Sequence, residues 1–124
     1  MEFSELLKPF ACSCGRTHSC DIRQIVICPG ALEALPEPTR DCGSILLAAD
    51  QNTWPTSGPA VEALRGGKKT DAVIFASEGF LVPDEAAIAA LQAKVTEQTD
   101  LILGIGSGVI QDLCKYVSFR SGLP

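Results

Sequence analysis

The residues of this sequence best placed to do chemistry form a glycine-rich turn near its end. An apolar run, Leu101 to Leu103, leads into Gly-Ile-Gly-Ser-Gly-Val-Ile-Gln-Asp, residues 104–112, and a helix-like stretch follows to Ser121. The pattern predicts a strand, a glycine turn and a helix. The first N–H groups of a helix lack partners, the helix dipole is positive there, and glycine has no Cβ to keep a ligand away. We therefore interpret the turn as a candidate cradle for a pyrophosphate group.

The same glycines also have a purely structural explanation. They fall at positions 104, 106 and 108, which is not the usual G-x-G-x-x-G spacing, and they follow the last predicted strand rather than the first. A tight connection between strand and helix uses glycine for backbone geometry alone. The glycine turn by itself leaves both interpretations open.

A carboxylate at a second strand end supports the ligand interpretation. Asp50 directly follows the apolar run Ser44 to Ala49, and a carboxylate there can accept hydrogen bonds from both hydroxyls of an adenosine ribose. The Asp50 carboxylate would suit NAD, which has a free 2′-hydroxyl, and would repel a 2′-phosphate. The alternative is an Asx turn over residues 50–53. Because ligands gather at the carboxyl edge of a parallel sheet, two complementary strand ends are more specific than either alone.

Asp112 and Lys115 are three residues apart and fall on one side of the predicted helix. They form a solvated ion pair, or else Asp112 contacts the nicotinamide end of a cofactor while Lys115 reaches an anionic substrate. The sequence has one histidine and no recognisable serine-histidine-acid set. No complete catalytic apparatus is therefore predicted, and no catalytic or metal-binding residue is assigned.

Four residues that can act as metal ligands lie within nine residues near the start: Cys12, Cys14, His18 and Cys20. Zinc could use them, although the spacing is not that of a standard zinc knuckle. The spacing therefore favours ordinary thiols beside a lone histidine, and a zinc-binding interaction domain stays an alternative. The other cysteines are predicted to be small buried hydrophobes: Cys28, Cys42 and Cys114.

From residue 25 onward, short apolar runs alternate with turns and amphipathic or alanine-rich stretches, which is typical of a parallel α/β sheet. Residues 1–24 fit the pattern less well and are predicted to be a lead-in segment with room for an extra strand, so that residues 25–124 form the α/β domain. The predicted strands are Ile25–Cys28, Ser44–Ala49, Ala72–Ala76 and Leu101–Ile105. The predicted helices lie near 31–35, near 59–65, from a first turn that contains Pro83 as far as Val95, and over 113–121.

The composition excludes several classes of protein. With 124 residues, 46% hydrophobic and 20% charged, the sequence is that of one globular domain. A net charge of -5, with Lys68-Lys69 as the only basic run, argues against a nucleic-acid surface. No apolar run has the length of a signal peptide or a membrane span, so we expect a cytoplasmic location and reduced thiols.

The segment from Gly106 to Lys115 resembles the G-G-G-x-x-x-D-x-x-K segment of the iron-containing alcohol dehydrogenase and dehydroquinate synthase superfamily. Within it, three further pieces are most similar to the sn-glycerol-1-phosphate dehydrogenase family: Cys12–His18, Ala49–Trp54 and Lys115–Gly122. The resemblance implies an N-terminal cofactor domain with a Rossmann-like parallel sheet and helices on both faces. The whole enzyme would reduce dihydroxyacetone phosphate to sn-glycerol-1-phosphate with NADH or NADPH.

The resemblance also assigns roles to residues. Asp50 would hold the adenosine ribose, and Asp112 would face the nicotinamide. Lys115 matches the family lysine near the active-site cleft, and Ser107 replaces the usual middle glycine. The residues expected against the cofactor are Asp50, Gly106, Ser107, Gly108, Val109, Ile110, Gln111 and Asp112.

In the resembling family a helical C-terminal domain supplies an aspartate and two histidines for a zinc, nickel or iron ion, and we expect none of these ligands within the 124 residues. The chain is therefore expected to be a cofactor-binding half, inert alone, which forms a homo-oligomer through an exposed apolar face. Two alternatives stay open: a fragment of a polyol dehydrogenase or dehydroquinate-synthase-like enzyme, and a non-catalytic nucleotide-binding or interaction module.

Overall fold

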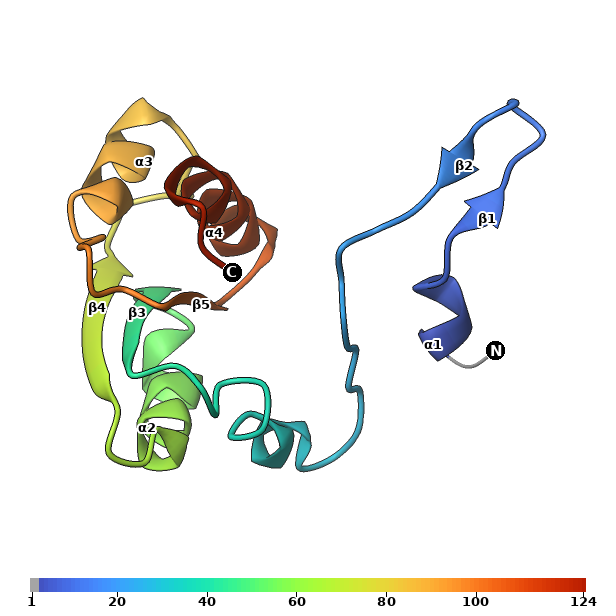
Figure 1. The fold of residues 1–124 in the computed structure, drawn as a ribbon. Coiled ribbons are helices and arrows are strands. Elements are labelled where there is room, and N and C mark those ends of the chain that lie inside the picture. Colours follow the sequence, from blue (N-terminus) through green and yellow to red (C-terminus); the bar gives the residue numbers. More distant parts are fainter. Residues whose placement is uncertain (1–2) are drawn as a thin grey trace. The chain divides into compact units, whose positions relative to one another are not determined.

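The computed structural model describes residues 3–124, which divide into two compact units (Figure 1). The first unit ends at Ala34 and the second comprises Leu35–Pro124. The first unit consists of short elements joined by irregular backbone: α1 (Phe3–Leu6), β1 (Phe10–Ala11), β2 (Thr17–His18) and the 3-10 helix η1 (Ala31–Ala34). The predicted division at residue 24 stays a prediction.

The second unit is built on a three-stranded parallel sheet with the strand order β4-β3-β5. Its strands are β3 (Ser44–Asp50), β4 (Lys69–Phe75) and β5 (Leu101–Ile105). At the carboxyl edge, Asp50 of β3 is level with Phe75 of β4, and Ala49 is level with Ile105 of β5. The register therefore places the ends of all three strands side by side.

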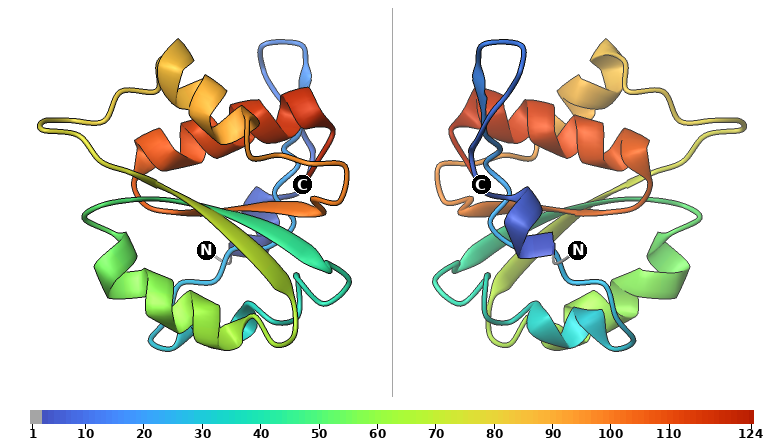
Figure 2. Two further views of the ribbon diagram at one scale, coloured as in Figure 1. Left: turned by 90° about the vertical axis from the view of Figure 1, so that its left-hand side faces the viewer. Right: turned by 90° about the vertical axis from the view of Figure 1, so that its right-hand side faces the viewer.

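Helices cover both faces of this sheet, as Figure 2 shows. One face packs on α2 (Trp54–Leu64), and the other packs on α3 (Glu85–Gln92) and α4 (Gly108–Ser121). A hydrophobic core lies on each face of the sheet, and alternate residues of β3 contribute to each. Leu46 and Ala48 face α3 and α4, whereas Ile45 and Leu47 face Val61 of α2. Such a strand is apolar throughout because both of its faces are buried. The predicted Rossmann-like α/β fold class is confirmed.

The helix termini follow from local residue chemistry. The Asp84 carboxylate caps α3 by accepting a hydrogen bond of 2.9 Å from the Ala87 N–H. Helix α4 ends at Ser121 and is capped by Gly122, whose φ of 67° is in the left-handed region that glycine adopts without a Cβ penalty. Among the described residues, no helix is long and apolar enough to cross a membrane.

The predicted strand Ile25–Cys28 is wrong, because these residues have irregular backbone and exposed side chains. A strand requires a hydrogen-bonded neighbour, and the strands described here pair only within the β1-β2 hairpin and the β4-β3-β5 sheet. Three other elements begin earlier than predicted: α2 at Trp54, β4 at Lys69 and α4 at Gly108. Helix α3 is shorter than predicted, because its N-cap, Asp84, follows Pro83 and its last residue is Gln92. Edge strand β4 accommodates Lys69 and Asp71 because one of its sides is open to solvent.

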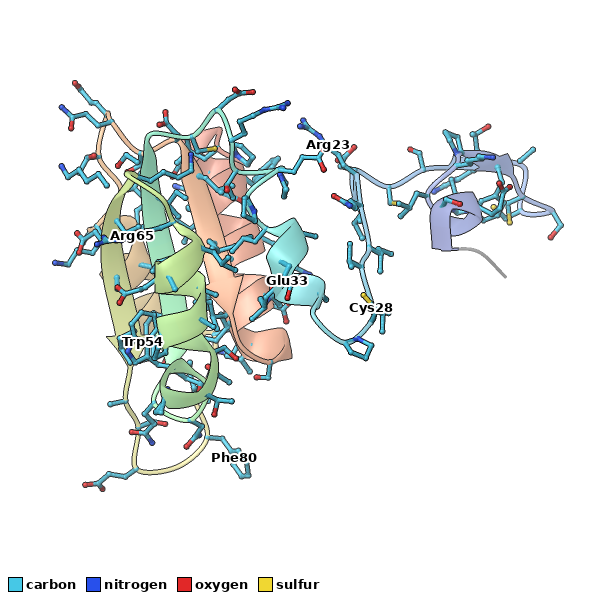
Figure 3. All side chains as sticks on the ribbon, turned by 90° about the horizontal axis from the view of Figure 1, so that it is seen from below. Arg23, Cys28, Glu33, Trp54, Arg65 and Phe80 are labelled. Atoms are coloured by element: carbon cyan, nitrogen blue, oxygen red, sulfur yellow. The ribbon has the colours of Figure 1, made fainter. Side chains whose placement is uncertain are left out.

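The cysteines divide into exposed and buried thiols. Cys114 is buried as predicted, Cys42 is half-buried, and the prediction that Cys28 is buried is wrong. Cys28 is exposed and lies on the irregular backbone that precedes η1 (Figure 3). Burial raises the pKa of the Cys114 thiol from its ordinary value of 9.0 to about 11.

This difference predicts selective alkylation. Because the thiolate is the nucleophile, Cys114 should react at least about 100-fold more slowly than Cys28 near pH 8 in the folded chain. In denaturant the two cysteines should react at similar rates. Peptide mapping by mass spectrometry after timed alkylation measures both rates, and rapid alkylation of Cys114 in the folded chain would contradict the packing of α4 on the sheet.

Candidate functional site

The turn that follows β3 is an Asx turn. The Asp50 Oδ1 atom accepts hydrogen bonds from the backbone N–H groups of Asn52, at 2.8 Å, and Thr53, at 2.9 Å. These bonds hold the carboxylate in one orientation. Because Oδ1 is occupied, the other oxygen, Oδ2, is the one that remains for a ligand.

Hydrogen bonds also tie this turn to the strands on both sides. On the β4 side, the Gln51 N–H donates to the Phe75 carbonyl at 2.9 Å, and Gln51 Nε2 donates to the Ser77 carbonyl at 2.8 Å. On the β5 side, the Thr53 hydroxyl donates to the Ile105 carbonyl at 2.8 Å. Residues 50–53 therefore form a fixed central part of the carboxyl edge.

The three glycines after β5 have different roles. A Cβ on Gly104 would lie 2.9 Å from Cys114 Sγ, and one on Gly106 would lie 2.7 Å from Ile110 Cγ1. Glycine at these two positions lets α4 pack closely against β5. A Cβ on Gly108 would have no atom of the chain within 4 Å. The structural explanation thus accounts for Gly104 and Gly106 but not for Gly108, which borders open space.

The N-terminus of α4 has no side-chain cap. Ser107 is the N-cap residue, but its hydroxyl makes no capping hydrogen bond, and the first backbone bond of the helical pattern is donated by the Gln111 N–H to the Ser107 carbonyl at 3.1 Å. The N–H groups of the residues from Gly108 to Ile110 therefore lack acceptors within the helix. This N-terminus can accept an anion next to the space at Gly108.

The structure brings Asp50 and the glycine turn together. Asp50 Oδ2 would lie 3.4 Å from a Cβ placed on Gly106. A pocket of about 140 Å³, open to solvent, lies at this edge. Its lining comprises Asp50, Gln51, Asn52, Phe75, Ser77, Gly79, Phe80, Leu81, Ser107 and Val109.

The loop after β4 is a part of the pocket that the sequence-based assignment missed. It contributes Ser77, Gly79, Phe80 and Leu81, and Phe80 extends away from the sheet with 98% of its surface exposed (Figure 3). The signal was available in the sequence, because this loop follows a parallel strand and must lie at the same carboxyl edge as Asp50.

Six of the predicted site residues are not part of the pocket lining: Gly106, Gly108, Ile110, Gln111, Asp112 and Lys115. Gln111 donates from Nε2 to the Gly104 carbonyl at 3.4 Å. Asp112 and Lys115 form an ion pair of 2.8 Å, with 59% and 75% of their side chains exposed. Such a pair contributes little to stability, and the contacts with cofactor and substrate that the resemblance implies for these residues stay predictions.

The first unit contains a separate group of side chains. Cys14 Sγ lies 3.2 Å from His18 Nε2, and the ligand atoms of Cys12, Cys14 and His18 all lie within 4.8 Å of one another. The backbone and thiol of Cys14 hydrogen-bond to the Cys12 sulfur and hold the pKa of that thiol below its ordinary value. Cys20 is exposed and lies outside the group.

The fold defines a Rossmann-like α/β protein, and its pocket lies where the parallel strands end. The chain belongs to the iron-containing alcohol dehydrogenase family, whose model matches residues 26–124. This confirms the resemblance found in the sequence.

Curated relatives carry the same family likeness. The chain is 29% identical over 120 residues to "Glycerol-1-phosphate dehydrogenase [NAD(P)+]" of Halalkalibacterium halodurans, covering 91% of this chain and 30% of the relative. It is 32% identical over 105 residues to a Thermofilum pendens protein of the same name, covering 82% of this chain and 29% of the relative. The chain thus spans less than a third of the length of these relatives.

A solved structure supports the fold. The crystal structure of glycerol dehydrogenase from Schizosaccharomyces pombe superposes with a TM-score of 0.61 at 20% sequence identity. The match covers 76% of this chain and 24% of that protein.

Proposed function

We propose that this chain is the NAD(P)-binding part of a glycerol-1-phosphate dehydrogenase. The observation that carries the proposal is the uncapped N-terminus of α4, which adjoins open space at Gly108 and lies beside the Asp50 carboxylate. Membership of a dehydrogenase family and the names of two curated relatives support it. The proposed activity of the whole protein is the reduction of dihydroxyacetone phosphate to sn-glycerol-1-phosphate.

The residues present fit a dinucleotide. The backbone N–H groups from Gly108 to Ile110 would hold the pyrophosphate, because no atom of the chain fills the space above Gly108. Asp50 Oδ2 would accept from a ribose hydroxyl, while Oδ1 keeps the turn in place. When bound, the cofactor supplies the hydride.

The resemblance assigns the metal that polarises the substrate carbonyl to a helical domain outside the 124 residues, and hydride transfer requires a positioned carbonyl. We therefore assign cofactor binding to this chain and reduction to the whole protein. We also propose that the protein forms a homo-oligomer and is located in the cytoplasm.

The test is titration of NADH into the chain, with Asp50→Asn as the informative variant. Asparagine retains an oxygen acceptor for the turn and removes the charge. We expect saturable NADH binding to weaken about tenfold, or about 1.4 kcal/mol, as charge-assisted hydrogen bonds are lost. Binding of NADPH should weaken less, because the carboxylate no longer repels the 2′-phosphate.

The matched control is Asp71→Asn on β4. Asp71 is an exposed carboxylate whose Oδ1 likewise accepts from a backbone N–H, that of Ala72 at 2.9 Å. Binding of NADH to this variant should equal that of the native chain. An equal loss of affinity in both variants would reject the assignment of Asp50 to the ribose.

A further inference from the structure

The second group of chemically competent side chains lies on the β1–β2 hairpin, in the sequence Cys-x-Cys-Gly-x-x-His from residue 12 to residue 18. Cys12 directly follows β1, Cys14 lies in the turn, and His18 ends β2. The proposed dinucleotide site uses none of these residues, so the group requires an explanation of its own.

The backbone of the hairpin brings the three side chains together. Phe10 pairs with His18 across the hairpin, and the Cys12 N–H donates to the Arg16 carbonyl at 2.9 Å. The turn closes with a 3.0 Å bond from the Gly15 N–H to the Cys12 carbonyl, and Gly15 adopts a φ of 83°. This left-handed residue reverses the chain and places Cys14 beside His18.

The ligand types and their spacing suit zinc. Two thiols and an imidazole are soft to borderline ligands, which zinc prefers to oxygen-rich sites. Ligand atoms around a tetrahedral Zn²⁺ stand about 3.5–3.8 Å apart, given Zn–S bonds of about 2.3 Å and Zn–N bonds of about 2.0 Å. The observed distance of 3.2 Å between Cys14 Sγ and His18 Nε2, and the 4.8 Å limit for all three atoms, require only small side-chain movements.

Within the part of the first unit that the structure describes, no buried core supports this hairpin. Its two strands have two residues each, and no residue from 4 to 34 whose burial is described is fully buried. An isolated hairpin of this size is marginal in water. Small units without a hydrophobic core are commonly held by a metal ion, whose binding free energy then contributes to folding.

We propose that the hairpin binds one zinc ion through Cys12 Sγ, Cys14 Sγ and His18 Nε2. The ion joins the two strands and the turn into one ordered element. This proposal is independent of the dinucleotide site and of the metal that the family resemblance assigns to a different domain.

The experiment measures zinc in the full 124-residue chain after purification with the metal and removal of the excess. We expect one zinc per chain, and Co²⁺ in its place should show thiolate-to-metal charge transfer and the visible absorption of a tetrahedral site. Cys14→Ser and His18→Asn should each weaken zinc binding at least 100-fold. The matched control is Cys28→Ser, an exposed cysteine of the same unit outside the group, which should retain one zinc.

Trp54, the only tryptophan, lies in the second unit, so its fluorescence checks that each variant keeps the α/β fold. Cys20→Ser tests the fourth coordination position: weaker binding assigns it to Cys20, unchanged binding assigns it to water, and either result supports the three ligands. Substoichiometric zinc in the native chain, equal zinc binding by His18→Asn, or a chain that forms a Cys12–Cys14 disulfide and takes up no metal would overturn the proposal.

Discussion

Replacing Gly106 by valine is expected to lower the free energy of unfolding by about 3 kcal/mol, at the upper end of the usual cost of overpacking. The first atom of the new side chain would lie 2.7 Å from Ile110 Cγ1 and 3.0 Å from Ile110 Cβ. Ile110 is fully buried and belongs to the core between the sheet and α4, so it has little room to move. Urea unfolding followed by Trp54 fluorescence measures the loss.

Gly108→Val is the control for this prediction, because a Cβ at that position meets no atom of the chain within 4 Å. Its free energy of unfolding should stay within about 0.5 kcal/mol of the native value. Equal destabilisation by the two valines would show that contact with Ile110 is not the cause of the lost stability.

Leu113→Ala is expected to cost about 2–5 kcal/mol, because it removes a buried side chain and leaves a cavity. Leu113 is 1% exposed and lies in the cluster that contains Leu46 of β3 and Leu91 of α3. Its loss therefore weakens the contact of α4 with the sheet and with α3 together.

Phe119→Ala on the same helix provides the comparison. Phe119 is 84% exposed, and its truncation should change the free energy of unfolding by no more than about 0.5 kcal/mol. Chemical denaturation of both variants gives the two values. A larger loss from Phe119→Ala than from Leu113→Ala would contradict the orientation of α4 described here.

The sequence predicted the parts of the fold that local patterns determine. The apolar run from Leu101, the glycine turn and the following helix are all present, and Asp50 lies next to the turn because parallel strands end at one edge. Asp50 also forms the Asx turn that was its alternative interpretation. The two interpretations are compatible, since each uses a different carboxylate oxygen.

Features that depend on distant partners could not be predicted in this way. The run at Ile25–Cys28 has the composition of a strand but pairs with none of the strands that the structure describes. Cys12 and Cys14 stand too close in sequence for a standard zinc knuckle, and only the turn at Gly15 brings both near His18. Burial and pairing of this kind are properties of the folded chain rather than of residue spacing.

The central claim is that the space at Gly108 receives a dinucleotide, and NADH titration of Gly108→Val against Gly67→Val tests it most directly. Neither glycine would have an atom within 4 Å of an added Cβ, and neither has a left-handed φ. The two valines should therefore be similar in stability. We expect Gly108→Val to bind NADH at least tenfold more weakly than the native chain and Gly67→Val to bind it equally well. Native-like NADH affinity in a folded Gly108→Val chain would contradict the claim.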